Sequence, residues 1–235
     1  MTYTRLILFD IDGTLLWPDG IGREAMKIAL EEVFGTAEPL EGYKFIGQTD
    51  RETVSVLMTQ AGFSPEVIGE KFDQLSAATC EAFIRLLDTK KHNIRPCTGA
   101  PELVAELAAR PDALLGLVTG NIRPLADLKL RAVGYDTSLF RVGAFGDQSE
   151  ARADLPPLAL TEARDLSGVL FKGKQIAILG DTPADISCGR ALGARSISVA
   201  TGSISADELA THNPDHLFAD FTDTQAVVDA IFAPV

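Results

Sequence analysis

Apolar residues recur along the chain with two periods, one typical of buried strands and one typical of amphipathic helices. Short apolar runs rich in β-branched and aromatic residues predict strands at residues 6–9, 113–118, 141–145, 175–179 and 195–199. A short edge strand is predicted to start near residue 213, and a helix then runs to Phe232. Because helical segments separate the strands, the pattern predicts an α/β protein with a doubly wound, mainly parallel sheet.

One long stretch breaks this alternation, since residues 20–91 contain no convincing strand. Helices are predicted at 22–34, 50–61 and 65–87. In the last of these, apolar residues recur at near-helical spacing: Val67, Phe72, Leu75, Ala78, Ala82, Phe83 and Leu86. We therefore expect an all-helical domain at residues 17–94, inserted into an α/β domain made of residues 1–16 and 95–235.

Composition and charge favour an enzyme that acts on small molecules. The 235 residues are 46% hydrophobic, enough for a sizeable core, yet no apolar run approaches the ~18 residues of a membrane span. Asp10 and Asp12 interrupt the only early apolar stretch, so no leader is expected. Three cysteines without CxxC spacing read as reduced, mostly buried thiols of a cytoplasmic protein: Cys80, Cys97 and Cys188. A net charge of −12 argues against nucleic-acid or anionic-membrane partners, and nothing indicates an oligomeric state.

The candidate chemistry begins where the first strand ends. Asp10 and Asp12 follow the apolar run and stand just before Gly13, at the sheet edge where parallel sheets bind ligands. Two carboxylates held together are costly unless a cation or a shared proton compensates them. Mg²⁺ prefers oxygen ligands and keeps room for a substrate phosphate. The pair thus favours Mg²⁺-dependent phosphoryl chemistry, with a solvated turn at a strand end as the alternative.

Three ordered motifs resemble those of the haloacid dehalogenase-like hydrolase superfamily. Residues 9–15 (FDIDGTL) are similar to its first motif, 117–121 (LVTGN) to its second, and 176–185 (IAILGDTPAD) to its fourth. The helical insert resembles the mobile cap of the phosphoglycolate phosphatase and β-phosphoglucomutase branch. The resemblance spans nearly the whole chain and implies a phosphatase core covered by a helical cap.

Roles for the acidic residues follow from this resemblance. Asp10 would be the nucleophile that forms an aspartyl-phosphate, and Asp12 the general acid and base. The family's Mg²⁺ would be held by the Asp10 carboxylate, the Asp12 main-chain carbonyl and Asp181, with Asp185 contacting it through water. Taken alone, Asp181 also fits an ordinary helix start before Pro183.

The resemblance also implies a phosphate site, and here the sequence departs from the family pattern. The Thr119 hydroxyl and the backbone N–H groups of Thr119, Gly120 and Asn121 are expected to contact phosphate oxygens. The family usually places a lysine between its second and fourth motifs, but residues 150–160 contain none. Arg152 is the only cation in that stretch, so we expect it to replace the lysine; the alternative is a solvent-exposed side chain.

In the insert, Gly47 and Gln48 occupy a loop where related caps often carry Gly-Arg, so both are expected to contact substrate. The three histidines lie outside every motif and are interpreted as surface or structural residues: His92, His212 and His216.

The favoured function is hydrolysis of a phosphomonoester, with a small phosphorylated metabolite as the substrate. Only the family resemblance suggests that this metabolite is phosphoglycolate. A phosphomutase would share every core residue. A non-catalytic binding module is disfavoured because both aspartates are present. Phosphonate cleavage would need a cap lysine in a special setting, and the cap lysines have none. Haloacid dehalogenation is disfavoured because that branch of the family lacks the second aspartate, which is present here as Asp12.

Overall fold

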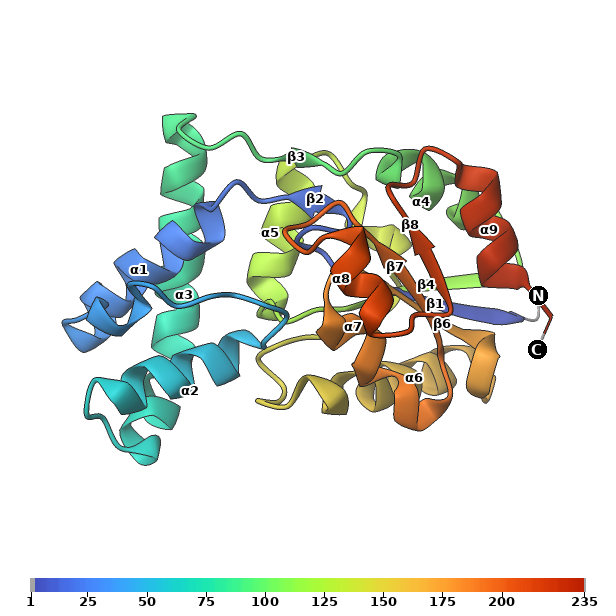
Figure 1. Cartoon of the computed structure of the whole chain (residues 1–235). Coiled ribbons are helices and arrows are strands. Elements are labelled where there is room, and N and C mark those ends of the chain that lie inside the picture. Colours follow the sequence, from blue (N-terminus) through green and yellow to red (C-terminus); the bar gives the residue numbers. More distant parts are fainter. Residues whose placement is uncertain (1–2, 235) are drawn as a thin grey trace.

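Six parallel strands form the centre of the protein in this computed structural model, which describes residues 3–234 (Figure 1). Their spatial order is β5-β4-β1-β6-β7-β8. The bounds are β1 Arg5–Phe9, β4 Ala113–Val118, β5 Val142–Ala144, β6 Ile176–Gly180, β7 Arg195–Val199 and β8 His216–Phe218. The predicted strands are therefore confirmed, with β5 shorter than expected.

Helices cover both faces of this sheet, as Figure 1 shows. Ile7 and Phe9 of β1 pack with α4 (Ala100–Ala108), α5 (Arg123–Ala132) and α9 (Thr224–Phe232). Leu6 and Leu8 face the opposite side, with α6 (Leu155–Ser167) and α7 (Pro183–Cys188). Successive strand residues point to opposite faces, so a run that is apolar at every position is buried on both sides. The doubly wound α/β class is confirmed.

Three helices between β1 and β4 form the cap, and its helices lie where the sequence predicts them. These are α1 (Ile21–Phe34), α2 (Asp50–Gln60) and α3 (Pro65–Thr89), with a 3₁₀ turn at Glu38–Leu40. The side chains of Thr49 and Ser64 cap α2 and α3 by accepting backbone N–H groups of their first turns. The cap helices bury an apolar cluster of their own, closed on the core side by Ile122 and Leu125.

A two-stranded ribbon that the sequence did not predict joins the cap to the core. β2 (Leu16–Trp17) pairs antiparallel with β3 (Arg95–Pro96), so the two connections run side by side. Strands of two residues are too short for any periodicity, which explains the omission. The division at residues 17–94 remains our prediction. α8 (Ala206–Thr211) packs beside β8 and completes the core.

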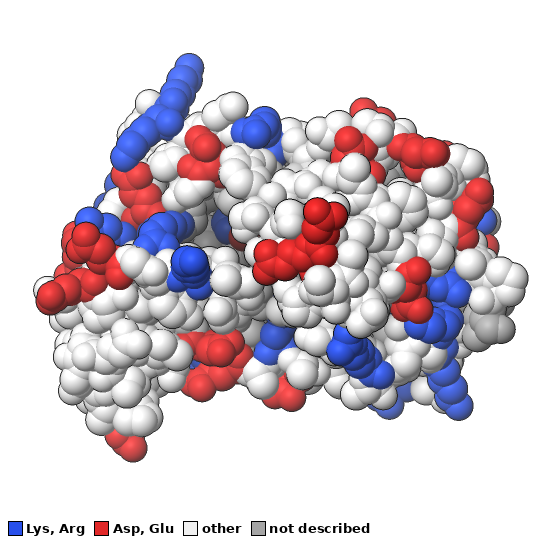
Figure 2. Space-filling model, viewed as in Figure 1, with Lys and Arg blue, Asp and Glu red and all other residues white. Residues whose placement is uncertain are grey.

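The described part of the chain contains no helix long and apolar enough to cross a membrane. Lysine and arginine side chains are scattered among acidic ones on the face shown in Figure 2, rather than gathered into one basic patch. Cys97 and Cys188 are buried and Cys80 is partly buried; burial raises the pKa of Cys80 and of Cys97 to about 11. A raised pKa leaves little of the nucleophilic thiolate at neutral pH, so neither Cys80 nor Cys97 is a candidate nucleophile.

Candidate active site

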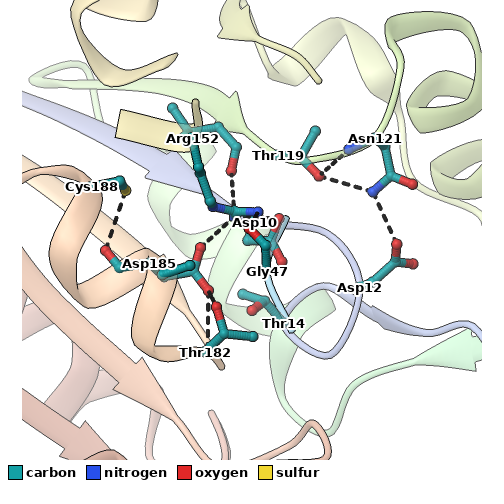
Figure 3. A network of polar contacts seen from close by, with 12 residues as sticks. Asp10, Asp12, Thr14, Gly47, Thr119, Asn121, Arg152, Thr182, Asp185 and Cys188 are labelled. Carbon is teal, nitrogen blue, oxygen red and sulfur yellow. Dashed lines mark hydrogen bonds and ion pairs between the residues drawn. The ribbon is translucent and has the colours of Figure 1, made fainter. Parts of the chain in front are cut away.

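The carboxyl ends of three neighbouring strands bring the predicted motifs together. In the ladder, Phe9 of β1 pairs with Leu117 of β4 and with Leu179 of β6. The residues that follow each strand must emerge at one edge of the sheet because the strands are parallel. Figure 3 shows the result, with Asp10, Thr119 and Asp185 around one centre.

Asp10, Asp181 and Asp185 form a buried acidic cluster. One carboxylate oxygen from each lies within 4.8 Å of the others. Burial raises the pKa of Asp10 to about 6 despite the opposing charge of Arg152, and burial together with Asp10 raises the pKa of Asp181 well above its usual range. Ionised carboxylates this close repel one another, and a hard cation that prefers oxygen ligands would relieve this repulsion.

The backbone is shaped around Asp181. A Cβ at Gly202 would lie 1.7 Å from Asp181 Oδ2, and one at Gly13 would lie 2.3 Å from the same atom. Gly13 also has φ +83°, in the left-handed region that favours glycine. The Thr14 hydroxyl donates to Asp181 Oδ1 at 3.2 Å. Three convergent carboxylates with the backbone this close fit a Mg²⁺ ion, and the donor set is all oxygen.

Arg152 is buried, which overturns the alternative of an exposed side chain. Its Nη2 donates to Asp10 Oδ1 at 3.0 Å and also contacts Asp185 Oδ1, while Nη1 donates to the Gly47 carbonyl at 3.0 Å. Asp185 Oδ2 in turn accepts from the backbone N–H of Thr182 at 3.0 Å. Arg152 is thus a fixed cation between the first and fourth motifs.

Lys129 is a residue of the site that the sequence did not predict. Its Nζ lies 2.5 Å from Asp12 Oδ2 and 2.6 Å from Asn121 Oδ1, and its side chain is only 4% exposed. The Nδ2 group of Asn121 also donates to Asp12 Oδ2, at 2.9 Å. A signal did exist: Lys129 shares the apolar face of α5 with Leu125 and Leu130, where an unpaired charge is not stable.

The Thr119–Asn121 turn offers fewer donors than expected. The Thr119 N–H donates to the Ala144 carbonyl at 3.2 Å, and the Asn121 N–H donates to the Thr119 hydroxyl oxygen at 3.3 Å. The Asn121 side chain donates to the same oxygen at 2.9 Å. The Thr119 hydroxyl proton and the Gly120 N–H remain for a ligand, so the expected use of the Thr119 N–H is wrong.

The cap loop before α2 is docked onto the core. The Asp50 N–H donates to the Gly120 carbonyl at 2.7 Å, and Asp50 Oδ2 accepts from the Ile122 N–H at 2.9 Å. Burial raises the pKa of Asp50 to about 6, against the opposing charge of Lys129. Asp50 therefore joins the cap loop to the start of α5, beside the Lys129 cluster.

Gly47 and Gln48 lie in this loop and face the site. A Cβ at Gly47 would lie 2.7 Å from Thr182 Oγ1, so the loop backbone touches the core directly. Gln48 turns its side-chain carbonyl back onto its own loop, accepting from the Ile46 N–H at 2.6 Å. Both residues line the cavity, as do Asp10, Asp12, Thr119 and Arg152. All the sequence-predicted site residues except Asp185 thus line one cavity.

The histidines lie outside this cavity, as expected. Among them, His92 is structural: its Nδ1 contacts the Asp19 carbonyl at 2.8 Å and its Nε2 contacts Glu24 Oε2 at 3.0 Å.

The cavity lies between cap and core and has a volume of about 710 Å³. Figure 2 shows the surface hollowed at this junction. The core contributes charged and polar groups to the cavity, and the cap contributes most of the apolar ones. This is the shape of a small-molecule site with one polar end.

Comparisons with known proteins agree with this geometry. A family model described as haloacid dehalogenase-like hydrolase matches residues 7–199. Pyrophosphatase PpaX from Bacillus velezensis is 24% identical over 92% of this chain and 93% of its own length. CbbY from Rhodobacter sphaeroides, solved in complex with phosphate, superposes with a TM-score of 0.64 at 23% identity, covering 94% of this chain and 96% of that one. The structure of a predicted phosphoglycolate phosphatase from Haemophilus somnus 129pt superposes with a TM-score of 0.66 at 20% identity, covering 97% of this chain and 99% of that one.

Proposed function

The chain belongs to the haloacid dehalogenase-like hydrolases, and we propose that within this family it is a Mg²⁺-dependent phosphatase that hydrolyses a small phosphomonoester through an aspartyl-phosphate. The observation that carries the proposal is the position of Asp10, which lies at the end of the central strand beside Asp181, Asp185 and Arg152 and lines the cavity under the cap.

A Mg²⁺ ion would be held by the carboxylates of Asp10 and Asp181 and by the main-chain carbonyl of Asp12, with Asp185 contacting it through water. When bound, it supplies positive charge against the phosphate oxygens and the carboxylates. Arg152 donates to Asp10 Oδ1 and so holds the carboxylate that would attack phosphorus.

In the first step, a carboxylate oxygen of Asp10 bonds to phosphorus while the bond from phosphorus to the ester oxygen breaks. Asp12 gives a proton to that oxygen, and the alcohol leaves. In the second step, Asp12 takes a proton from water, whose oxygen attacks phosphorus. The bond to Asp10 then breaks, and inorganic phosphate is released with the carboxylate restored.

The remaining polar groups hold these reactants in place. Arg152 offsets the charge of Asp10 as a phosphate dianion approaches, and the Thr119 hydroxyl donates to a phosphate oxygen. Lys129 and Asn121 both donate to Asp12 Oδ2, so they orient the acid–base group. We assign Lys129 as a positioning residue that acts through Asp12.

Phosphate release from a panel of phosphomonoesters with Mg²⁺ tests the activity, and two variants test the mechanism. Asp10→Asn removes the nucleophile and is expected to abolish turnover while the protein stays folded. Asp12→Asn keeps the nucleophile, so with 4-nitrophenyl phosphate a phosphoenzyme is expected to accumulate, detectable as a mass increase on Asp10. Near wild-type turnover by Asp10→Asn would refute the covalent mechanism. Slow phosphate release with interconversion of sugar phosphates would indicate the phosphomutase alternative instead.

A further inference from the structure

The leaving group of the substrate would bind at the end of the cavity that lies away from the phosphate site. The start of α1 lies beside the acid–base group, because a Cβ at Gly22 would lie 3.2 Å from Lys129 Nζ, which in turn holds Asp12. An ester oxygen protonated by Asp12 therefore has its organic group next to the cap and the ribbon that leads to it.

Apolar side chains form part of the wall at this end. Seven apolar or aromatic residues from the cap, the ribbon and the loop after β7 line the cavity: Trp17, Pro18, Met26, Tyr43, Phe45, Ile46 and Ile204. Phe45 and Ile46 are adjacent, line the cavity and are 39% and 40% exposed. Leaving this apolar surface in water is unfavourable, and a bound apolar group would cover it.

The cations of the cavity are almost all engaged. Four basic residues line it. Arg152 and Lys129 pair with aspartates of the reaction centre. Arg23 donates from Nη1 to the Tyr43 carbonyl at 2.6 Å and from Nη2 to the Leu40 carbonyl, and it stacks over the Phe45 ring at 5.3 Å. Arg23 and the exposed Lys44 are the two without an acidic partner among the described residues.

Two acidic residues, Asp50 and Glu208, line the cavity as well, so their carboxylates offset the two cations that lack an acidic partner. A second anionic group on the substrate would therefore gain no net attraction from these walls. Discrimination of this kind works through unpaired charge as much as through attraction.

Resting on the proposed phosphatase function, we infer that the leaving group is an uncharged, largely apolar alcohol, aromatic or aliphatic. We expect a lower kcat/KM for a leaving group that carries a carboxylate or a second phosphate, because the same walls offer it no net attraction. The inferred class thus differs from the pyrophosphate named for the Bacillus relative.

The test compares substrates that share a primary-alcohol leaving group. Phosphate release is measured with Mg²⁺ for 2-phenylethyl phosphate, n-butyl phosphate, glycerol 3-phosphate and 2-phosphoglycolate, and with inorganic pyrophosphate. We expect kcat/KM for the first two to exceed that for 2-phosphoglycolate and pyrophosphate, whose leaving groups are anionic, by about tenfold or more, which is the scale of one methylene contact in a hydrophobic pocket. Glycerol 3-phosphate, whose leaving group is uncharged but polar, should give a lower kcat/KM than n-butyl phosphate.

A charge placed in the wall provides the second measurement. Ile46→Lys is expected to shift the ratio of kcat/KM for 2-phosphoglycolate over 2-phenylethyl phosphate about tenfold toward the acid. Ile84→Lys is the matched control, since Ile84 is an exposed residue of the cap helix α3 that does not line the cavity. Its ratio should stay at the wild-type value.

The outcomes separate the two proposals. Higher kcat/KM for phosphoglycolate or pyrophosphate, or an equal shift in both lysine variants, would overturn the inference and leave the phosphatase standing. Phosphate release from none of the compounds would refute the proposed function, and the inference would fall with it.

Discussion

Lys129→Met tests whether a buried lysine acts through the acid–base aspartate. The substitution keeps the length of the side chain but removes both the charge and the donors to Asp12 Oδ2 and Asn121 Oδ1, at 2.5 and 2.6 Å. Methionine suits the neighbouring apolar face of α5, so the fold is expected to persist. The variant therefore loses the ion pair that positions the Asp12 carboxylate.

The size of the effect is bounded from two sides. A hydrogen bond to a charged group contributes roughly 1.5–3 kcal/mol, and general acid–base catalysis is worth ~10²–10⁴-fold. Asn121 still donates to Asp12 Oδ2 at 2.9 Å, so part of the orientation remains. We expect kcat to fall about 10²-fold, equivalent to about 2.7 kcal/mol at 1.36 kcal/mol per tenfold.

The assay is a double-mutant cycle on kcat, with Lys129→Met placed in the wild-type and Asp12→Asn backgrounds. If Lys129 acts through Asp12, the second background should show less than about a threefold further loss. Lys174→Met is the matched control, because it breaks a Lys–Asp pair with Asp215 that does not line the cavity. An equal loss in both backgrounds would refute the positioning role, and a loss confined to KM would place Lys129 against substrate instead.

The same geometry leads to predictions for Arg152, for the metal and for Asp50. Arg152→Ala should lower kcat/KM roughly 10²-fold or more. Arg152→Lys should restore only part of the lost kcat/KM, because lysine lacks the bidentate geometry of arginine. Unchanged steady-state kinetics of Arg152→Ala would mean that another residue supplies the cation. Mg²⁺ at 100 times its Kd should add about 2.7 kcal/mol to the free energy of unfolding and so raise the melting temperature, while Ca²⁺ should bind but inhibit. Full activity in excess chelator would contradict this. Burial raises the pKa of Asp50 to about 6, so the folded state binds its proton more tightly than the unfolded chain. Stability without metal should therefore fall as the pH rises from about 4 to 6, and Asp50→Asn should recover about 2 kcal/mol at pH 7 in denaturant unfolding; identical pH profiles for the two proteins would refute it.

Much of this protein is determined by local sequence pattern alone. The strand that ends in Asp10 is apolar at every position because both faces of the central sheet are covered, and this is visible in the sequence. The cap helices follow from apolar spacing and from capping residues such as Thr49 and Ser64. Arg152 was predicted from the family resemblance, as the only cation in the stretch where the family usually carries a lysine. All these features depend on neighbours a few residues away.

Tertiary structure decided what depends on distant residues meeting. Lys129 reaches Asp12 across 117 positions of sequence, and Arg152 reaches Asp10 across 142, because parallel strands carry the intervening chain back to one edge of the sheet. The two-residue strands of the β2–β3 ribbon exist only through their pairing. The apolar wall of the cavity likewise forms where the cap loop docks on the core. Local periodicity encodes which face of an element is buried, but the partners on that face are set by long-range packing. This is why the sequence could predict Asp10 and Asp12 as candidate catalytic residues, while only the fold revealed which residues hold and surround them.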